Sequence, residues 1–162
     1  MSEVALKEML TEDLAGRGDV QSAFGENVIT VQLEHLTFFF EKLKSDRYSF
    51  DYLTNLTAVD YEENFTVIYN FRSLSRKYKL TVRVVIDRNN PELPSATGFW
   101  KTADWQEREV FDMMGIRFAG HPDLKKILLS DEFEGHPLRK DFKYESRRIQ
   151  PEVSDPDVKI IR

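Results

Sequence analysis

Three neighbouring segments rich in β-branched and aromatic residues constrain the fold of this chain more than any other feature. They are LTAVDY at 56–61, FTVIYNF at 65–71 and KLTVRVVI at 79–86, and the sequences between them, EEN and RSLSRKY, are short enough for hairpins. Alternate residues of the second and third segments are apolar: Phe65, Val67, Tyr69 and Phe71, then Leu80, Val82, Val84 and Ile86. We therefore expect an antiparallel meander whose apolar face is covered by helices.

The sequence before this meander predicts two helices and one further strand. A first helix is expected between a cap at Ser2 and a stop at Gly16, because apolar residues follow helical spacing at Leu6, Met9, Leu10 and Leu14. The segment VITVQL at 28–33 alternates as a strand does. A second helix follows this strand, with apolar residues at Leu36, Phe39, Phe40 and Leu43.

The sequence after the meander predicts a loop and then two helices. Residues 87–98 are a loop by composition, with two prolines and a glycine. A helix is expected from a cap at Thr102 to a stop at Gly115. A shorter helix is expected to begin at Pro122, with a small apolar face made by Leu124, Ile127 and Leu128.

These elements indicate an α+β fold, in which an antiparallel or mixed sheet of about four strands is covered by helices. A length of 162 residues suits one domain, which we assign to residues 1–142, including a long C-terminal loop. Beyond that point the chain is polar and is interrupted by Pro151 and Pro156. We therefore interpret residues 143–162 as an extended assembly arm that has no core of its own.

The composition excludes several kinds of site. The chain has no cysteine, so it can form no disulfide and can hold no iron–sulfur cluster or zinc ion through thiolates. Its apolar runs are far shorter than the roughly 20 residues of a membrane span. A net charge of -5 argues against nucleic acid as the main partner, although residues 139–148 are locally basic. A nucleic-acid module built on that basic segment is a third and weaker class of function.

Two of the three histidines, His121 and His136, stand in the same Gly-His-Pro triplet. One interpretation is a metal or acid–base site, with Asp123, Asp131 or Glu132 as further ligands. The other is a pair of turns, because the residue before a proline leaves the helical region and the preceding glycine permits unusual backbone angles. The spacing of the histidines matches no recurring zinc motif, so we favour the turns.

The helix expected after Thr102 carries a carboxylate on its apolar side. Glu107 lies in the middle of a sector of about 80° that also holds Ala103, Val110, Phe111 and Met114. Burial of an unpaired carboxylate costs several kcal/mol, so we infer either a salt bridge to an arginine or a raised pKa. Its function would be that of a catalytic acid or, as we favour, that of a structural ion pair.

The opposite side of the same helix carries Trp105, Arg108, Glu109 and Asp112. Arg108 and Asp112 are four residues apart, the spacing of an ion pair on a helix. A tryptophan among polar residues either marks a contact with another protein or is covered by the loops of residues 116–142. The sequence leaves both interpretations of Trp105 open.

The stretch from residue 103 to residue 142 resembles the signature region of the 30 kDa-type subunit of respiratory complex I, also called the C subunit of NADH-quinone oxidoreductase. The matched residues are Glu107, Arg108, Glu109, Asp112, Met113, Met114, His121, Lys125 and the segment GHPLRKD at 135–141. Upstream, YLTNLTAVDY at 52–61 is also similar to a strand of this family.

The resemblance implies a non-catalytic scaffold subunit in the hydrophilic arm of a proton-translocating, quinone-reducing complex. Such a subunit would bind no metal, flavin or cluster, would leave those cofactors to its partner subunits, and would dock on the subunit that helps to build the quinone site. It would lie peripherally at the cytoplasmic face of the cell membrane and support electron transfer from NADH to quinone. The implied signature and interface residues are Trp105, Glu107, Arg108, Glu109, Asp112, His121, Asp123, Lys125, His136, Arg139, Lys140 and Asp141.

Two alternatives stay open at this point. Related subunits occur in membrane-bound hydrogenases, F420H2 dehydrogenases and photosynthetic complex I, so the electron donor is not fixed. A rival class of function is a self-sufficient enzyme that uses Glu107 and His121 as acid and base.

Overall fold

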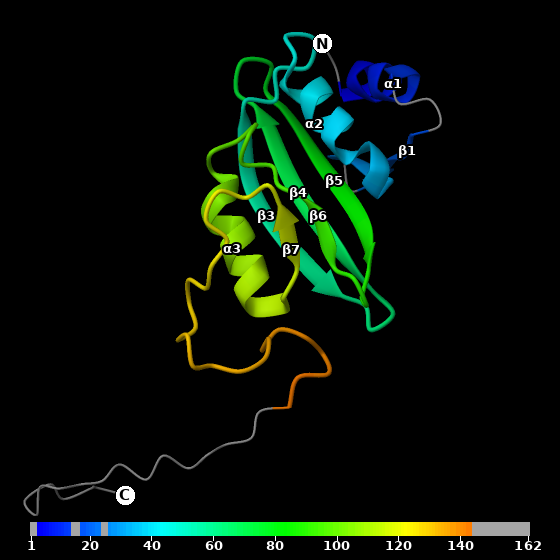
Figure 1. Cartoon of the computed structure of the whole chain (residues 1–162). Helices are drawn as coiled ribbons and strands as arrows, with labels where there is room; N and C mark the ends of the chain where they lie inside the picture. Colours follow the sequence, from blue (N-terminus) through cyan, green and yellow to red (C-terminus); the bar gives the residue numbers. More distant parts are fainter. Residues whose placement is uncertain (1–2, 14–16, 24–25, 144–162) are drawn as a thin grey trace, which may run out of the picture.

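A mixed five-stranded sheet forms the centre of the structure, a computed structural model that describes residues 3–13, 17–23 and 26–143 (Figure 1). The strands lie in the order β1-β2-β5-β4-β3. Their bounds are Gly18–Ala23 for β1, Glu26–Val31 for β2, Tyr52–Asp60 for β3, Asn64–Ser73 for β4 and Tyr78–Asp87 for β5. β2 runs parallel to β5, and the other neighbours are antiparallel. The expected α+β class with a mixed sheet is confirmed.

Strands β3, β4 and β5 form the antiparallel meander that the sequence predicts. The register of β4 and β5 pairs Phe65 with Ile86 and Phe71 with Leu80, so the two apolar rows meet on one face of the sheet. All eight side chains of these rows are at most 2% exposed. This face of the sheet is therefore one wall of the hydrophobic core.

Strand β1, at one edge of the sheet, is not predicted from the sequence. Its residues GDVQSA include a single large apolar side chain, Val20, and carry no strand signal of their own. The strand pairs antiparallel with β2 along its whole length, from Gly18 opposite Val31 to Ala23 opposite Glu26. Backbone pairing with β2, rather than local propensity, therefore makes this segment a strand.

The helices cover the apolar face of the sheet (Figure 1). They are α1 at Glu3–Asp13, α2 at Leu36–Lys44, which a 3-10 turn at Leu33–His35 precedes, and α3 at Ala103–Met114. The predicted apolar faces of the first two are confirmed by the burial of Leu6, Leu10, Leu36, Phe39, Phe40 and Leu43. The expected cap at Ser2 and stop at Gly16 lie outside the described residues.

Aromatic side chains fill the space between α2 and the meander. Phe40 meets Tyr69 edge-on at 5.3 Å between ring centroids and meets Trp100 edge-on at 5.4 Å. Trp100 also packs against Phe71 at 4.6 Å, and its indole N–H donates to the carbonyl of Phe50 at 2.8 Å. The indole is thus buried without an unsatisfied donor, which fixes the chain just before α3.

Helix α3 begins and ends where the sequence predicts, but Thr102 does not cap it. The Thr102 hydroxyl donates to the carbonyl of Leu53 on β3, at 3.1 Å, and makes no capping bond. Gln106 accepts a hydrogen bond from the N–H of Leu56 on the same strand. The side chains of Thr102 and of Gln106 on α3 therefore occupy backbone groups of β3, the other edge strand. At the far end Gly115 has φ 68, which confirms it as the helix stop.

Two short parallel strands flank α3 in the sequence, β6 at Glu92–Pro94 and β7 at Arg117–Ala119. The expected loop at 87–98 therefore contains a strand, which is too short to leave a signal in the sequence. The helix expected from Pro122 is absent: residues 122–130 are irregular. Asp112 of α3 binds the backbone N–H groups of Ile127, Leu128 and Leu129, and this contact replaces the helical pattern.

The predicted arm at 143–162 lies, apart from Lys143, outside the described residues, so its boundary with the domain at 1–142 stays a prediction. Within the described ranges, no helix is both long enough and apolar enough to cross a bilayer.

Candidate functional site

The predicted site residues lie on α3 and on the irregular segment 120–143, which we call the signature loop. The structure brings the two together, because polar side chains of α3 and of the signature loop bind backbone groups of one another. Five predicted residues come from the helix and seven from the signature loop: Trp105, Glu107, Arg108, Glu109 and Asp112, then His121, Asp123, Lys125, His136, Arg139, Lys140 and Asp141.

Asp112 is the anchor of the middle of the signature loop. It is 1% exposed, and its Oδ2 atom accepts hydrogen bonds from the N–H groups of Ile127, Leu128 and Leu129 at 3.0, 2.8 and 2.9 Å. Burial alone would raise the pKa of Asp112, but these three N–H groups and the charge of Lys126 hold it below its usual range. The carboxylate thus binds three consecutive backbone N–H groups, as a capping residue does at the start of a helix, although residues 127–129 are not helical.

Arg108 holds the same part of the signature loop, but as a hydrogen-bond donor to backbone carbonyls, whereas Asp112 is an acceptor for backbone N–H groups. Its Nε and Nη2 atoms donate to the carbonyls of Lys125 and Lys126, each at 3.2 Å, and its guanidinium lies over the Trp105 ring at 5.5 Å. The predicted ion pair between Arg108 and Asp112 is therefore wrong. Each charge instead satisfies backbone groups of the signature loop, which has no helical or sheet pairing of its own to do so.

His121 fixes the start of the signature loop to the first turn of α3. Its side chain is fully buried, and Nδ1 accepts a hydrogen bond from the N–H of Asp123 at 3.0 Å. In the neutral ring Nε2 therefore carries the proton, and it lies 3.1 Å from the carbonyl of Asp104 and 3.4 Å from Oδ1 of the same residue. Asp123 in turn pairs with Lys125 at 2.7 Å on the exposed side.

His136 fixes the second triplet to the last turn of α3. Its Nδ1 lies 2.9 Å from the carbonyl of Asp112 and donates to it, because a carbonyl oxygen can only accept. The ring fills the space beside Gly115: a Cβ atom on that glycine would lie 2.3 Å from His136 Nε2. A larger residue at Gly115 would therefore displace the histidine.

The two histidines thus bind α3 two turns apart and do not form one site. Gly120 and Gly135 both have positive φ, 83 and 91, which confirms the interpretation of the triplets as turns. Among the described residues, no three His, Asp or Glu side chains converge in a way that could hold a metal ion.

The end of the signature loop is held at the tips of the meander. Arg139 Nε donates to the carbonyl of Met114 at 2.6 Å, and the N–H of Lys140 donates to Asp60 Oδ2 at 2.9 Å. Asp141 pairs with Arg88 at 2.9 Å, and the other branch of Arg88 pairs with Asp60. These contacts join the signature loop to the end of α3, to the end of β3 and to the residue that follows β5.

Asp60 and Arg88 make most of the contacts that hold the end of the signature loop, although neither is among the predicted site residues. Asp60 is 4% exposed; burial would raise its pKa, but Arg88 and the N–H groups of Lys140 and Glu62 outweigh burial and lower the pKa to about 2. One signal was present in the sequence. Asp60 shares the apolar register of Leu56 and Ala58 on β3, so a carboxylate had to face the core there.

Glu107 is fully buried, and the expected salt bridge to an arginine is wrong. Its Oε2 accepts from the Ser95 hydroxyl at 2.7 Å, and Oε1 accepts from the Ala96 N–H at 2.6 Å. Burial raises the pKa of Glu107 to about 7 against these two hydrogen bonds, and the charge of Asp104 raises it further. The alternative expectation of a raised pKa is therefore confirmed. Burial and the Glu107 charge also raise the pKa of Tyr69.

Three large apolar side chains stay exposed around this framework. Trp105 is 66% exposed, Leu128 65% and Leu138 57%, so the signature loop does not cover the tryptophan. Leu138 borders a small crevice of about 30 Å³ that Met113 and Glu109 also line. Exposed apolar side chains on a segment whose backbone is held by buried polar contacts are typical of a protein-binding face.

The sequence matches the model of a protein family described as "Respiratory-chain NADH dehydrogenase, 30 Kd subunit" over residues 29–148. The C subunit of NADH-quinone oxidoreductase from Moorella thermoacetica is 42% identical over 130 residues, which cover 79% of this chain and 87% of that protein. The corresponding subunit from Citrifermentans bemidjiense is 38% identical over 152 residues, 91% of each chain.

Two solved structures share the fold. A trypsin-resistant fragment (1–134) of Nqo5 is 30% identical, with a TM-score of 0.66 over 74% of this chain and 98% of the fragment. A chain of the membrane-bound sulfane sulfur reductase, an archaeal respiratory membrane complex, is 20% identical and has a TM-score of 0.76 over 98% of both chains. The second likeness concerns the fold alone.

Proposed function

Because the chain belongs to the family of the 30 kDa subunit of respiratory-chain NADH dehydrogenase, we propose that its signature surface docks on the subunit that helps to build the quinone site. The signature surface consists of α3 and the signature loop, with Trp105, Leu128 and Leu138 exposed on it. In this proposal the chain is a scaffold in the hydrophilic arm of an NADH-quinone oxidoreductase. It supports electron transfer from NADH to quinone without taking part in the chemistry.

One observation carries the proposal: Asp112, Arg108 and Asp60 bind backbone groups of the signature loop and so hold it against α3 and β3. Asp112 and Arg108 hold the middle of the signature loop, and the Asp60–Arg88 pair holds its end. Such contacts fix the shape of a surface, which lowers the entropy that a partner must overcome on binding. Catalytic groups, in contrast, need access to a substrate.

We further propose that flavin and iron–sulfur clusters belong to partner subunits, since the chain has no cysteine to ligate a cluster. The complex would hold this chain peripherally, at the cytoplasmic face of the membrane. NADH is the electron donor favoured by the names of the relatives, which are NADH-quinone oxidoreductase subunits.

The test uses two leucines of almost equal exposure. Leu128 on the signature surface is 65% exposed, and Leu74 in the turn between β4 and β5 is 63% exposed. A tagged chain carrying Leu128→Asp should recover about tenfold less of the quinone-site subunit from detergent-solubilised membranes, the loss expected for a central interface residue. The Leu74→Asp chain should recover as much as the unaltered chain. Equal recovery by both variants would remove the signature surface from the interface.

A second candidate function is an acid–base enzyme, which the raised pKa of Glu107 favours. Both Glu107 and the His121 side chain are fully buried, so a substrate would have to open the core to reach them. Activity of the purified chain toward NADH and quinone, lost in Glu107→Gln, would support the enzyme. An inert chain that restores activity when added to a complex lacking it would support the scaffold.

A further inference from the structure

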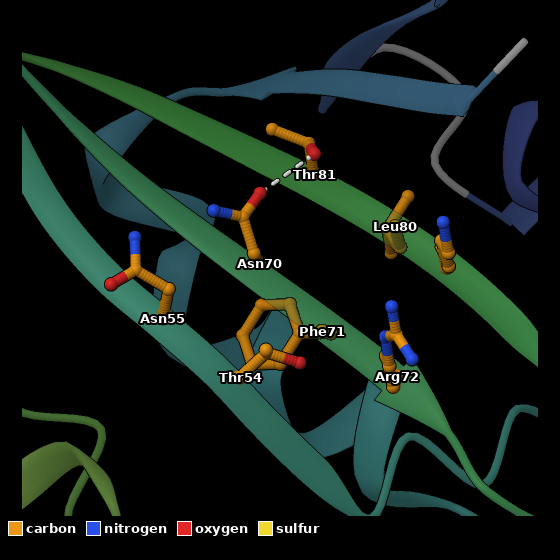
Figure 2. Close-up of a pocket in the computed structure, with 8 residues that line it drawn as sticks. Thr54, Asn55, Asn70, Phe71, Arg72, Leu80 and Thr81 are labelled. Atoms are coloured by element: carbon orange, nitrogen blue, oxygen red, sulfur yellow. Dashed lines mark hydrogen bonds between the residues drawn. The ribbon is translucent and has the colours of Figure 1, made fainter.

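The sheet has a second face, which the described helices leave uncovered. We call it the open face: it carries the residues of β3, β4 and β5 that alternate with the core residues. The pairs Tyr52–Arg72 and Thr66–Val85 mark its two ends. In Figure 2, which shows the open face, the drawn helices lie behind the sheet.

The charged residues in the middle of the open face are basic, and its one described carboxylate, Asp87, lies at the far end of β5. Arg72 lies opposite Lys79 on the neighbouring strand, and Arg83 lies two rows further along. Between the two end pairs, no described position of the open face carries a carboxylate. The chain as a whole has 28 acidic and 23 basic residues, so three basic residues without a carboxylate between the two end pairs are more than its composition would give. This face is therefore complementary to negative charge.

A hollow of about 200 Å³ lies at the cationic end of the open face. Figure 2 shows its polar side chains on three adjacent strands, with the amides of Asn55 and Asn70 side by side and Arg72 further along β4. The Thr81 hydroxyl donates to Asn70 Oδ1 at 2.9 Å, which leaves the Asn70 amide nitrogen turned to the other side as a donor. The hollow thus offers hydrogen-bond donors next to cationic side chains.

Arg72 is the residue best suited to recognise a ligand there. Its guanidinium is exposed, and it forms no ion pair with any residue that the structure describes. A guanidinium fork fits a carboxylate in a bidentate manner. The ligand class is therefore a carboxylate.

Apolar groups on the same face favour a protein over a free anion. Tyr52, next to Arg72, is 43% exposed, and Val85, at the other end of the open face, is 49% exposed. Ile68 is half-buried between them. Aromatic and aliphatic side chains on the same face as an arginine are typical of protein interfaces, whereas a small anion would use only the hollow.

We propose that the open face is a second docking surface, which binds an acidic segment of another protein chain and seats one of its carboxylates in the hollow at Arg72. The signature surface includes α3, on the other side of the sheet, so both surfaces can be occupied at once (Figure 1). The chain would then join two neighbours. This proposal does not depend on which subunit meets the signature surface.

The experiment places a photo-crosslinking residue at Val85 and purifies the assembled membrane complex with the full chain. We expect one crosslinked peptide from another subunit, with an aspartate or glutamate in the crosslinked segment. Arg72→Glu should lower the crosslink yield about tenfold, and Arg72→Gln should lower it less, because only the glutamate repels the partner. The melting temperature of the isolated variants should stay unchanged.

Two controls make the outcome decisive. Lys42→Glu makes the same charge change on α2, on the helix-covered side of the sheet, and should leave the yield unchanged. Replacement of the crosslinked carboxylate by lysine should restore the yield in Arg72→Glu. Crosslinks only to lipid, to nucleic acid or to a second copy of this chain, or a yield that Arg72→Glu leaves unchanged, would overturn the proposal. Loss of the chain from the complex in Leu128→Asp reports on the signature surface alone.

Discussion

Oδ2 of Asp112 lies 2.8 Å from the backbone nitrogen of Leu128 and accepts its hydrogen bond, together with those of the two neighbouring amides. One buried carboxylate thereby sets the path of the signature loop across α3. Leu128 is the exposed apolar residue in the middle of that loop. The position of this exposed side chain on the signature surface therefore depends on the buried side chain of Asp112.

The first prediction concerns this carboxylate. Asp112→Asn removes the charge from three charge-assisted hydrogen bonds, so we expect the free energy of unfolding to fall by about 1–3 kcal/mol. Urea denaturation measures this loss, and amide exchange at residues 127–129 should become faster. Glu109→Gln makes the same chemical change at an exposed position of α3 and should be neutral. Unchanged exchange at 127–129 in Asp112→Asn would contradict the proposed anchor.

The second prediction is that stability falls at neutral pH because of Glu107. Its pKa is about 7 in the folded chain and 4.5 as an ordinary glutamate, so the folded state holds the proton more tightly. The resulting stabilisation is fully present below about pH 4.5 and is lost as the pH rises to about 7, a change of about 3 kcal/mol. Glu107→Gln should abolish this decline. Urea midpoints at a series of pH values test it, and a decline that persists in the variant would assign it to another group.

The third prediction has the opposite sign and concerns Asp60. Its pKa is lowered from 3.8 to about 2, so its ion pair with Arg88 stabilises the fold above about pH 4 and is lost as the pH falls toward 2. In Asp60→Asn, the free energy of unfolding should therefore fall less between about pH 4 and pH 2 than it does in the unaltered chain. Protease cleavage in the segment 136–143 should also become faster, because asparagine has one acceptor oxygen for the three donors that the two oxygens of Asp60 bind. An unaltered fall over this pH range would show that other carboxylates dominate it.

The fourth prediction separates two effects at glycines. Gly115→Ala should destabilise the fold by more than about 1 kcal/mol, since it adds strain at positive φ and a contact of 2.3 Å with His136. Gly120→Ala adds strain at positive φ but has open space around it. Gly98→Ala has open space and no positive φ, and should be neutral. Melting temperatures should therefore rank Gly98→Ala above Gly120→Ala above Gly115→Ala; any other order would contradict the packing role of His136.

The fifth prediction concerns the arm at 143–162. Its scattered apolar residues and two prolines give it no core, so its deletion should leave the melting temperature of the isolated chain nearly unchanged. Incorporation of the chain into the membrane complex should fall, because an arm that orders on binding contributes contact area there. A collapse of the isolated domain would show that the arm packs on its own core. Normal incorporation would show that it is only a solvated tail.

The sequence predicts those elements whose own side chains decide their structure. The alternation of apolar residues in β4 and β5 and the helical spacing around Phe39 and Phe40 report burial directly, and the predictions of these elements are confirmed. β1 and the short strands β6 and β7 form because neighbouring strands pair with their backbones. Backbone pairing alone requires no particular pattern of side chains, so the sequence does not predict these strands.

The site shows the same division. A buried carboxylate at Glu107 followed from helical periodicity, but its partners did not, because Ser95 and Ala96 belong to a loop whose path only the fold sets. The Arg108–Asp112 spacing suits an ion pair, yet each side chain instead binds backbone groups of the signature loop. These backbone groups have no helical or sheet partners and would otherwise be left without hydrogen bonds. Local spacing therefore overestimates side-chain pairing wherever an irregular segment crosses a helix.

The contacts of Thr102 and Gln106 with Leu53 and Leu56 have a consequence for the chain before it joins its complex. An edge strand with free backbone groups invites strand addition by other chains, which is a common route to aggregation. Here Thr102, just before α3, and Gln106 on α3 occupy two backbone groups of β3 at that edge. Strand addition at this part of β3 would have to break both contacts, so the edge is protected at Leu53 and Leu56 while the chain is still free of partners.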